Sequence, residues 1–324
     1  MRKVIQLDLL GHRMFGTLHD SSLDPSQPQR TYRTGVLLLS FGQQPRSWVG
    51  DLGSSIADRL EKLGYPTFRF DMPGLGDSPG AIPIYLEELW RDILLGAHEP
   101  PLHALCENLA HLYSLKELVV GGFCGGAVTA LYAINARSPL IKGLILLEPE
   151  MALVRTSSTT KSTMPEPLTV DAYQENIDLI KSRITSLYSW RRLISAKADF
   201  RFWHTLWFRL FDHAMRKIKS VGKRKKTLPP ETNQRMLNSW NLARQLRIPT
   251  LVLSVASINR AKYYRAYGLN PGVEHLKSKL SWHQIPNTTH ALLTGGAKDL
   301  VGMHFENWLK KNYPTQDSGK SLTT

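Results

Sequence analysis

A cysteine enclosed by glycines is the residue of this sequence with the clearest capacity for chemistry. Cys124 lies in residues 122–126, which read Gly-Phe-Cys-Gly-Gly, directly after a strand-like apolar run and directly before an Ala-rich segment that favours a helix. Small flanking residues suit a sharp strand-to-helix turn, where larger side chains would clash. The free N–H groups and positive dipole end at the start of that helix favour a thiolate. We therefore expect Cys124 to be a nucleophile, the alternative being an ordinary buried cysteine at a glycine-rich turn.

A histidine near the end of the chain is the natural partner of such a nucleophile. His290 follows the strand-like run 280–285 and precedes a predicted helix over 299–309. An imidazole can take the proton of a thiol and later protonate a leaving group, so we expect His290 to be the base. His283, inside the strand-like run, is the lesser candidate. Because the chain has 11 histidines, the alternative for His290 is an ordinary surface-loop residue.

The elements that must position these residues alternate between strand-like apolar runs and amphipathic helical segments from Arg33 onward. That alternation predicts an α/β fold with a mostly parallel central sheet flanked by helices on both faces. The strand-like runs are 35–40, 67–70, 117–121, 143–147, 249–254 and 280–285. The predicted helices are 47–63, 85–113 with an interruption near Pro100 and Pro101, 125–136 and 299–309.

Three short segments resemble the α/β-hydrolase superfamily, and the resemblance covers about residues 35–309. Residues 122–126 have the form of its Gly-x-Ser-x-Gly nucleophile elbow, with Cys124 in the position of the serine. Residues 71–78 resemble its Asp-x-x-Gly-x-Gly-x-Ser loop, and residues 287–290 look like the late loop that carries its histidine. The resemblance implies the α/β-hydrolase fold, with a nucleophile, a base and an acid brought together from distant parts of the chain.

The cysteine at the elbow points to particular members of the superfamily. It is similar to the cysteine that dienelactone hydrolases and polyhydroxyalkanoate synthases carry in place of serine. A weaker likeness, through residues 14–19 and 190–195, is to the hydrolases that accompany bacterial exosortase systems.

The acid is the point at which the sequence departs from the superfamily pattern. An Asp is expected after the run 249–254, but residues 255–259 contain no acid. Glu148 ends the preceding strand-like run, the place from which certain haloalkane dehalogenases supply their acid, and it could orient and stabilise His290. Glu150 is the rival, and the alternative for Glu148 is a strand-end carboxylate that faces solvent. A Cys–His dyad without a third member also remains open.

The resemblance further implies an oxyanion hole made of two backbone N–H groups. One belongs to Gly125, the residue after the nucleophile, and the other to the loop that follows the first buried strand. In that loop Phe41 and Gly42 stand where the superfamily often has His-Gly, so the expected second donor is Gln43. The alternative is that the loop is only a strand-to-helix turn.

About a hundred residues without clear strands separate the last two strands of the expected core from the earlier ones. Residues 151–247 carry long amphipathic helical patterns and are predicted to form an inserted helical cap. The α/β core is then assigned to residues 1–150 and 248–314, and the polar tail 315–324 is expected to be disordered.

The formal net charge of +14 is concentrated in the predicted cap. Between Lys181 and Lys226 there are fourteen Lys and Arg but only two acidic residues, which accounts for twelve of the excess charges. The plain interpretation is a set of solvated helix faces over an apolar underside. The functional interpretations are a basic rim that attracts coenzyme A or an acyl carrier protein, or a contact with an anionic membrane surface. A role in binding nucleic acid is disfavoured because the sequence has no nucleic-acid-binding signature.

The cysteine count and the lengths of the apolar runs indicate which cofactors and which cellular location to expect. The two cysteines, Cys106 and Cys124, are too few for a disulfide framework and have no metal-ligand spacing, so we expect neither a metal nor another cofactor. No apolar run reaches the roughly 18–20 residues of a membrane span, and Asp8 interrupts the only early apolar run, so a cytoplasmic location is expected.

Together these features predict a cysteine-dependent hydrolase or acyltransferase that acts on an ester or thioester through a covalent acyl-enzyme. Two alternatives belong to other classes of function. One is a non-catalytic binding protein with an α/β-hydrolase-like fold, which the missing late Asp favours. The other is a peripheral binder of anionic membranes that acts through the basic cap.

Overall fold

The computed structural model describes residues 1–20, 34–40, 44–153, 231–255, 264, 267–269, 279–293 and 296–315. Their helices and strands belong to one compact unit, formed by Met1–Ser157 and Glu231–Thr324. The predicted cap falls mostly on residues 154–230, and the predicted disordered tail almost entirely on residues 316–324, both outside the described residues.

An eight-stranded sheet in the order β1-β2-β4-β3-β5-β6-β7-β8 forms the centre of this unit. The strands from β4 to β8 run parallel, whereas β2 pairs antiparallel with both β1 and β4. Their bounds are β1 Arg2–Leu9, β2 His12–His19, β3 Thr34–Leu39, β4 Thr67–Phe70, β5 Glu117–Phe123, β6 Ile141–Leu147, β7 Thr250–Val255 and β8 Leu280–Ile285.

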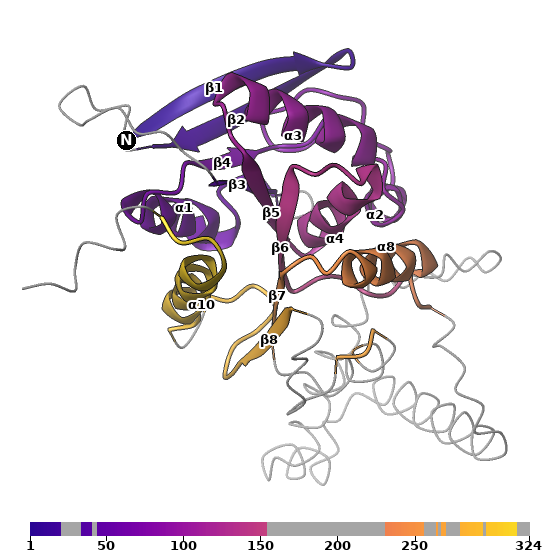
Figure 1. The fold of residues 1–324 in the computed structure, drawn as a ribbon. Helices are drawn as coiled ribbons and strands as arrows, with labels where there is room; N and C mark the ends of the chain where they lie inside the picture. Colours follow the sequence, from indigo (N-terminus) through magenta and orange to yellow (C-terminus); the bar gives the residue numbers. More distant parts are fainter. Residues whose placement is uncertain are drawn as a thin grey trace, which may run out of the picture. The chain divides into compact units, whose positions relative to one another are not determined.

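Helices cover both faces of the sheet (Figure 1). On one face lie α1, Leu52–Lys62, and α10, Ala297–Asn312, which pack against each other. On the other lie α2, Leu86–Leu94, α3, Glu99–Leu112, α4, Gly125–Tyr132, and α8, Gln234–Gln245. Two 3-10 segments, Val49–Asp51 and Ala133–Ala136, adjoin α1 and α4. The predicted mostly parallel sheet with helices on both faces is therefore confirmed.

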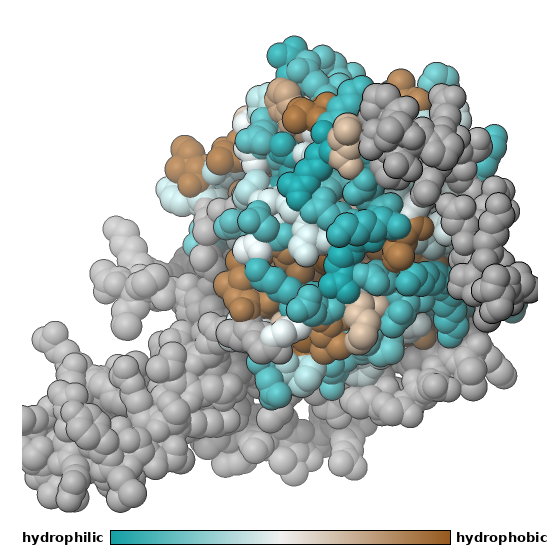
Figure 2. All heavy atoms as spheres, turned by 90° about the vertical axis from the view of Figure 1, so that its left-hand side faces the viewer, coloured by the Kyte–Doolittle hydropathy of each residue, from teal (hydrophilic) through white to brown (hydrophobic). Residues whose placement is uncertain are grey.

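The central strands are mostly apolar because both of their faces are covered. Every residue of β3, β4 and β7 is buried. One continuous cluster of buried side chains lies between the sheet and the pair α1 and α10, and it includes Cys124. The outer surface of this side is mainly hydrophilic (Figure 2), and Arg59 of α1 links the two helices by ion pairs to Asp299 at 3.2 Å and Glu306 at 2.5 Å.

The N-terminal hairpin of β1 and β2 is a part of the sheet that the sequence analysis did not predict. Its two-residue turn, Leu10 and Gly11, has φ values of 52° and 77°. Positive φ at both turn positions matches the right-handed twist of a tight hairpin. The turn residue Gly11 was therefore a usable sequence signal.

One predicted boundary shifts for an identifiable reason. The interruption expected at Pro100 and Pro101 falls earlier, because these prolines occupy the first turn of α3, where a missing N–H costs nothing. The helix α8 lies within residues 151–247, yet it packs against α4 in the same compact unit as the sheet. Within the described residues, each helix is too short or too polar to serve as a transmembrane span.

Candidate active site

Cys124 stands at the sharp junction between β5 and α4. Its backbone has φ 53° and ψ −114°, a conformation that a non-glycine residue adopts only under strain. The N–H of Cys124 donates to the carbonyl of Leu147 on the neighbouring strand at 2.9 Å, and its own carbonyl accepts from Ala127 and Val128 at the start of α4. These bonds hold the turn in place. The Cys124 side chain is buried, with 2% of its surface exposed.

The glycines around Cys124 are required by close backbone contacts. A Cβ atom on Gly122 would lie 2.2 Å from the carbonyl oxygen of Gly126. A Cβ atom on Gly126 would lie 2.0 Å from the carbonyl oxygen of Ser40, at the end of β3. Any side chain at either position would collide with rigid backbone, so the glycine pattern that the sequence shows is a consequence of this geometry.

His290 is paired with Glu148, 142 positions earlier in the chain. The distance from Nδ1 of His290 to Oε2 of Glu148 is 3.0 Å. The second carboxylate oxygen of Glu148, Oε1, accepts the backbone N–H of Val255 at 2.5 Å. Glu148 is fully buried and has a φ of 48°, and its own N–H donates to Leu253 at 2.7 Å. With Nδ1–H directed to the carboxylate, the lone pair of the imidazole lies on Nε2, as a proton acceptor requires.

The imidazole of His290 lies close to the turn that carries Cys124. Its ring centroid is 5.6 Å from the ring of Phe123, the residue before the cysteine. On its other side Phe123 meets Trp48 edge-to-face at 5.7 Å. The indole of Trp48 donates to the carbonyl of Leu39 at 2.8 Å, which ties the two ends of the loop after β3 together. Phe123 thus packs between that loop and the imidazole.

The other sequence-predicted residues occupy different places. Glu150 is buried and accepts the N–H of Ala152 at 3.3 Å, a bond within its own turn. The ring of His283 stacks on His304 of α10 at 4.4 Å, and burial lowers the pKa of both imidazoles. Gly125 is the first residue of α4, where a backbone N–H has no acceptor within the helix. Gln43 lies outside the described residues.

Sequence reasoning missed a buried ion pair beside this edge of the sheet. Asp71, fully buried at the end of β4, accepts both the backbone N–H and a guanidinium N–H of Arg46, each at 2.6 Å. It also accepts the N–H of Asp77 at 3.1 Å. One carboxylate therefore joins the loop after β3 to the loop after β4. Residues 71–78 were recognisable as a motif, but nothing in the sequence indicated Arg46 as the partner.

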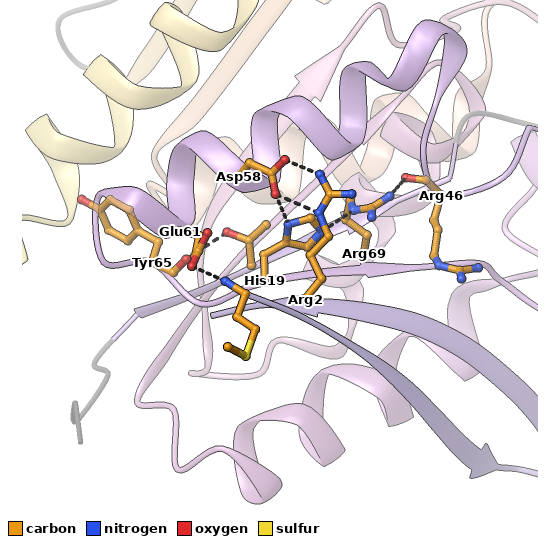
Figure 3. Close-up of polar contacts among 9 residues, drawn as sticks. Arg2, His19, Arg46, Asp58, Glu61, Tyr65 and Arg69 are labelled. Carbon is orange, nitrogen blue, oxygen red and sulfur yellow. Dashed lines mark hydrogen bonds and ion pairs between the residues drawn. The ribbon is translucent and has the colours of Figure 1, made fainter. Parts of the chain in front are cut away.

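A polar network continues from Arg46 towards the N-terminal hairpin (Figure 3). Arg69 donates from Nη1 to the carbonyl of Arg46 and from Nε to Nε2 of His19, both at 2.9 Å. Nδ1 of His19 lies 2.7 Å from Asp58, which also binds Arg2. Since Nε2 accepts from Arg69, His19 is neutral, and burial together with the nearby charge of Arg69 lowers its pKa to about 4. Burial and the charge of Arg46 lower the pKa of Arg69 to about 10.

Across the described ranges, His, Cys, Asp and Glu side chains never gather in a set of three that could ligate a metal ion. What the site does contain is a strained cysteine, a carboxylate-bound imidazole nearby and a helix start beside the cysteine. These are the parts that nucleophilic catalysis with general acid–base assistance uses.

Comparison with known proteins places the fold but not the activity. No protein-family model matches this sequence, and the comparison with curated protein sequences finds no match. Among solved structures, that of DcsB in complex with its substrate analogue has 12% identity and a TM-score of 0.54, over 96% of this chain and 100% of that one. The haloalkane dehalogenase DatA from Agrobacterium tumefaciens C58 has 11% identity and a TM-score of 0.53, over 96% and 97%. The chain has the α/β-hydrolase fold.

A third similar structure shows how widely this fold is used. The Pyrococcus furiosus esterase Pf2001 matches with 15% identity and a TM-score of 0.50, over 96% of this chain and 91% of that one. A dehalogenase and an esterase thus share the α/β-hydrolase fold with this protein, so the fold alone does not decide the reaction. The likeness to exosortase-associated hydrolases stays a prediction, and of its two segments residues 190–195 lie outside the described residues.

Proposed function

We propose that this protein is a cysteine-dependent hydrolase or acyltransferase that acts on an ester or thioester through a covalent acyl-enzyme. One observation carries the proposal: the Glu148 carboxylate is held by a backbone N–H on one oxygen and by His290 on the other, beside the turn that presents Cys124. A buried carboxylate in that position fixes the imidazole tautomer and stabilises its protonated form.

In the proposed reaction, Nε2 of His290 takes the proton of the Cys124 thiol, and the sulfur attacks the carbonyl carbon of the substrate. The carbon–oxygen π pair moves to the oxygen, and the resulting oxyanion accepts hydrogen bonds from the N–H groups of Gly125 and Gln43. When the tetrahedral intermediate collapses, the bond to the leaving group breaks, and protonated His290 gives its proton to the departing oxygen or sulfur. Cys124 is then acylated.

The second half of the reaction regenerates the thiol. Water, or another hydroxyl or thiol, loses a proton to His290 and attacks the acyl carbon, and the carbon–sulfur bond breaks with return of the proton to Cys124. A thiolate favours thioester substrates, because exchange between two thioesters is nearly isoenergetic. Coenzyme A or an acyl carrier protein would then be the carrier, and the basic stretch 181–226 supplies charge of the sign that attracts either. A cytoplasmic location belongs to the same proposal, since a catalytic thiol must stay reduced.

The test is intact-protein mass spectrometry after exposure to a panel of acyl thioesters and p-nitrophenyl esters. We expect a mass increase of one acyl group on Cys124 that is lost in Cys124→Ala and strongly slowed in His290→Ala. The matched control is Cys106→Ala, because Cys106 is the other cysteine, is equally buried, and has a pKa that burial raises far above its usual range. Equal acylation of the wild type and His290→Ala, or none in the wild type, would contradict the proposal.

A further inference from the structure

A buried hydroxyl without a partner lies beside the cysteine turn. Ser40, the residue after β3, has only 2% of its surface exposed. Its Oγ makes no hydrogen bond with any group in the described part of the chain. Buried side-chain hydroxyls in folded proteins nearly always have a partner, since desolvating one without compensation lowers stability. An exception that persists next to a reactive residue calls for a chemical explanation.

The position of Ser40 follows from the sheet register. The β3 residue Leu39 pairs with Gly122 on the parallel strand β5, so Ser40 lies next to Phe123 and one residue below the level of Cys124. The carbonyl oxygen of Ser40 also lies against Gly126 of α4, so closely that a Cβ atom on residue 126 would not fit. The main chain of Ser40 therefore lies beside both the end of β5 and the first turn of α4. The oxyanion of a substrate bound to Cys124 must form in this same corner, near the N–H of Gly125.

We propose that the Ser40 hydroxyl is a further hydrogen-bond donor to the oxyanion, a role that rests on the function proposed above. When the Cys124 sulfur bonds to the carbonyl carbon and the π pair moves to oxygen, Oγ–H of Ser40 donates to that oxygen, and the bond is released when the carbonyl re-forms. The hydroxyl then has no partner in the free protein because its partner exists only during the reaction. A donor placed in advance costs no reorganisation when charge develops, which is how oxyanion holes work.

This role predicts that one substitution, Ser40→Ala, lowers catalysis without lowering stability. Ser40→Ala removes a desolvated hydroxyl and leaves no new unpaired group, so the melting temperature stays the same or rises. At the same time kcat for p-nitrophenyl butyrate falls by about 10²-fold with little change in KM, since the lost bond is made only in the transition state. A serine with a merely structural role would lower stability and leave kcat unchanged.

The matched control is Ser239→Ala on α8. Ser239 is equally buried, but its hydroxyl bonds to Asn135 at 2.9 Å and to the carbonyl of Arg235 at 3.3 Å, away from Cys124. That variant should melt at a lower temperature and keep its kcat. A second readout is the affinity for a butyl trifluoromethyl ketone, which forms a tetrahedral adduct with a thiolate. Ser40→Ala should weaken it by a factor similar to the loss in kcat.

The outcomes separate this inference from the function on which it rests. If Cys124→Ala abolishes hydrolysis but Ser40→Ala keeps kcat and ketone affinity within twofold of the wild type, the donor role is wrong and the cysteine mechanism stands. If Cys124→Ala retains hydrolysis, or the wild type forms no butyryl-cysteine, both are wrong. A fall in kcat accompanied by a lower melting temperature, as for Ser239→Ala, would also overturn the donor role.

Discussion

Oε2 of Glu148 lies 3.0 Å from Nδ1 of His290, and the same carboxylate takes the backbone N–H of Val255 on its other oxygen. The acid of the candidate site thus stands at the end of β6, and the end of β7 contributes a peptide group where many proteins of this fold would place the acid itself. The carboxylate is held in one orientation by the end of β7 on one oxygen and by His290, after the end of β8, on the other.

Glu148→Gln should lower kcat without unfolding the protein. An amide at this position would accept from Val255 and direct its NH₂ towards Nδ1, which then has to accept, so the proton of His290 moves to Nε2, the wrong atom for a base. We expect a loss of about 10²-fold, less than for a serine enzyme because a thiol depends less on the third residue. Steady-state kinetics measure this. Glu150→Gln is the matched control, and a loss of equal size there would argue against the assignment of Glu148.

Gly122 and Gly126, two residues before and two after Cys124, should tolerate no side chain. Gly126→Ala places a Cβ 2.0 Å from the Ser40 carbonyl oxygen, and because backbone cannot yield like a flexible side chain, we expect a loss of about 3 kcal/mol or more in the free energy of unfolding. Gly296→Ala is the control: it has a φ of 70° but no atom within 4 Å of an added Cβ, so only the backbone cost of about 1 kcal/mol remains. Urea denaturation of both variants tests the difference, and similar midpoints would contradict it.

His19 should make stability depend on pH in the acid range. The folded protein keeps His19 neutral down to a pKa of about 4, whereas in the unfolded chain it titrates near 6.5. Between these values the unfolded state binds more protons, so the free energy of unfolding falls as pH drops, by up to about 3 kcal/mol. The variant His19→Gln can still donate to Asp58 and accept from Arg69 but cannot titrate. Its stability should vary less between pH 6.5 and 4, and an unchanged slope would show that another group is responsible.

The ion pair of Arg46 and Asp71 should matter far more for stability than a surface pair. Arg46→Met leaves a carboxylate fully buried without its counter-charge, a change that typically costs about 3–5 kcal/mol. Arg13→Met removes the exposed partner of Asp8, a pair worth less than about 1 kcal/mol. Thermal denaturation at neutral pH compares the two, and comparable losses would mean that Asp71 finds other compensation.

Much of this architecture could be predicted from local sequence patterns. The strand-like runs preceding Cys124 and Glu148 are mainly apolar, and a third strand-like run precedes His290. The carboxyl ends of parallel strands meet at one edge of a sheet, so the proximity of these residues followed from strand assignment. The identity of the acid that pairs with His290 was harder to predict, because it depends on which side chain at the strand end points towards the imidazole. Sequence offered two acids, Glu148 and Glu150, two residues apart, and it took the structure to show that Glu148 is hydrogen bonded to His290.

The features that escaped prediction depend on contacts between distant residues. Arg46 and Asp71 are 25 positions apart on different loops, and an arginine in a loop carries no pattern that names its partner. The unpaired state of the Ser40 hydroxyl is a property of its surroundings alone. The N-terminal hairpin was missed although residues 5–9 of β1 alternate apolar and polar side chains, the pattern of a strand with one buried face.

Because β7 contributes to Glu148 through its main chain, the side chain at position 255 is not part of that bond. Nineteen of the twenty genetically encoded amino acids have the N–H that the carboxylate needs, and only proline lacks it. The bond that anchors Glu148 thus survives substitution of residue 255, whereas an acid supplied by the side chain of that residue would be lost. Every substitution of Val255 except proline keeps the N–H that holds Glu148, so only the packing of this buried side chain limits which residues fit here.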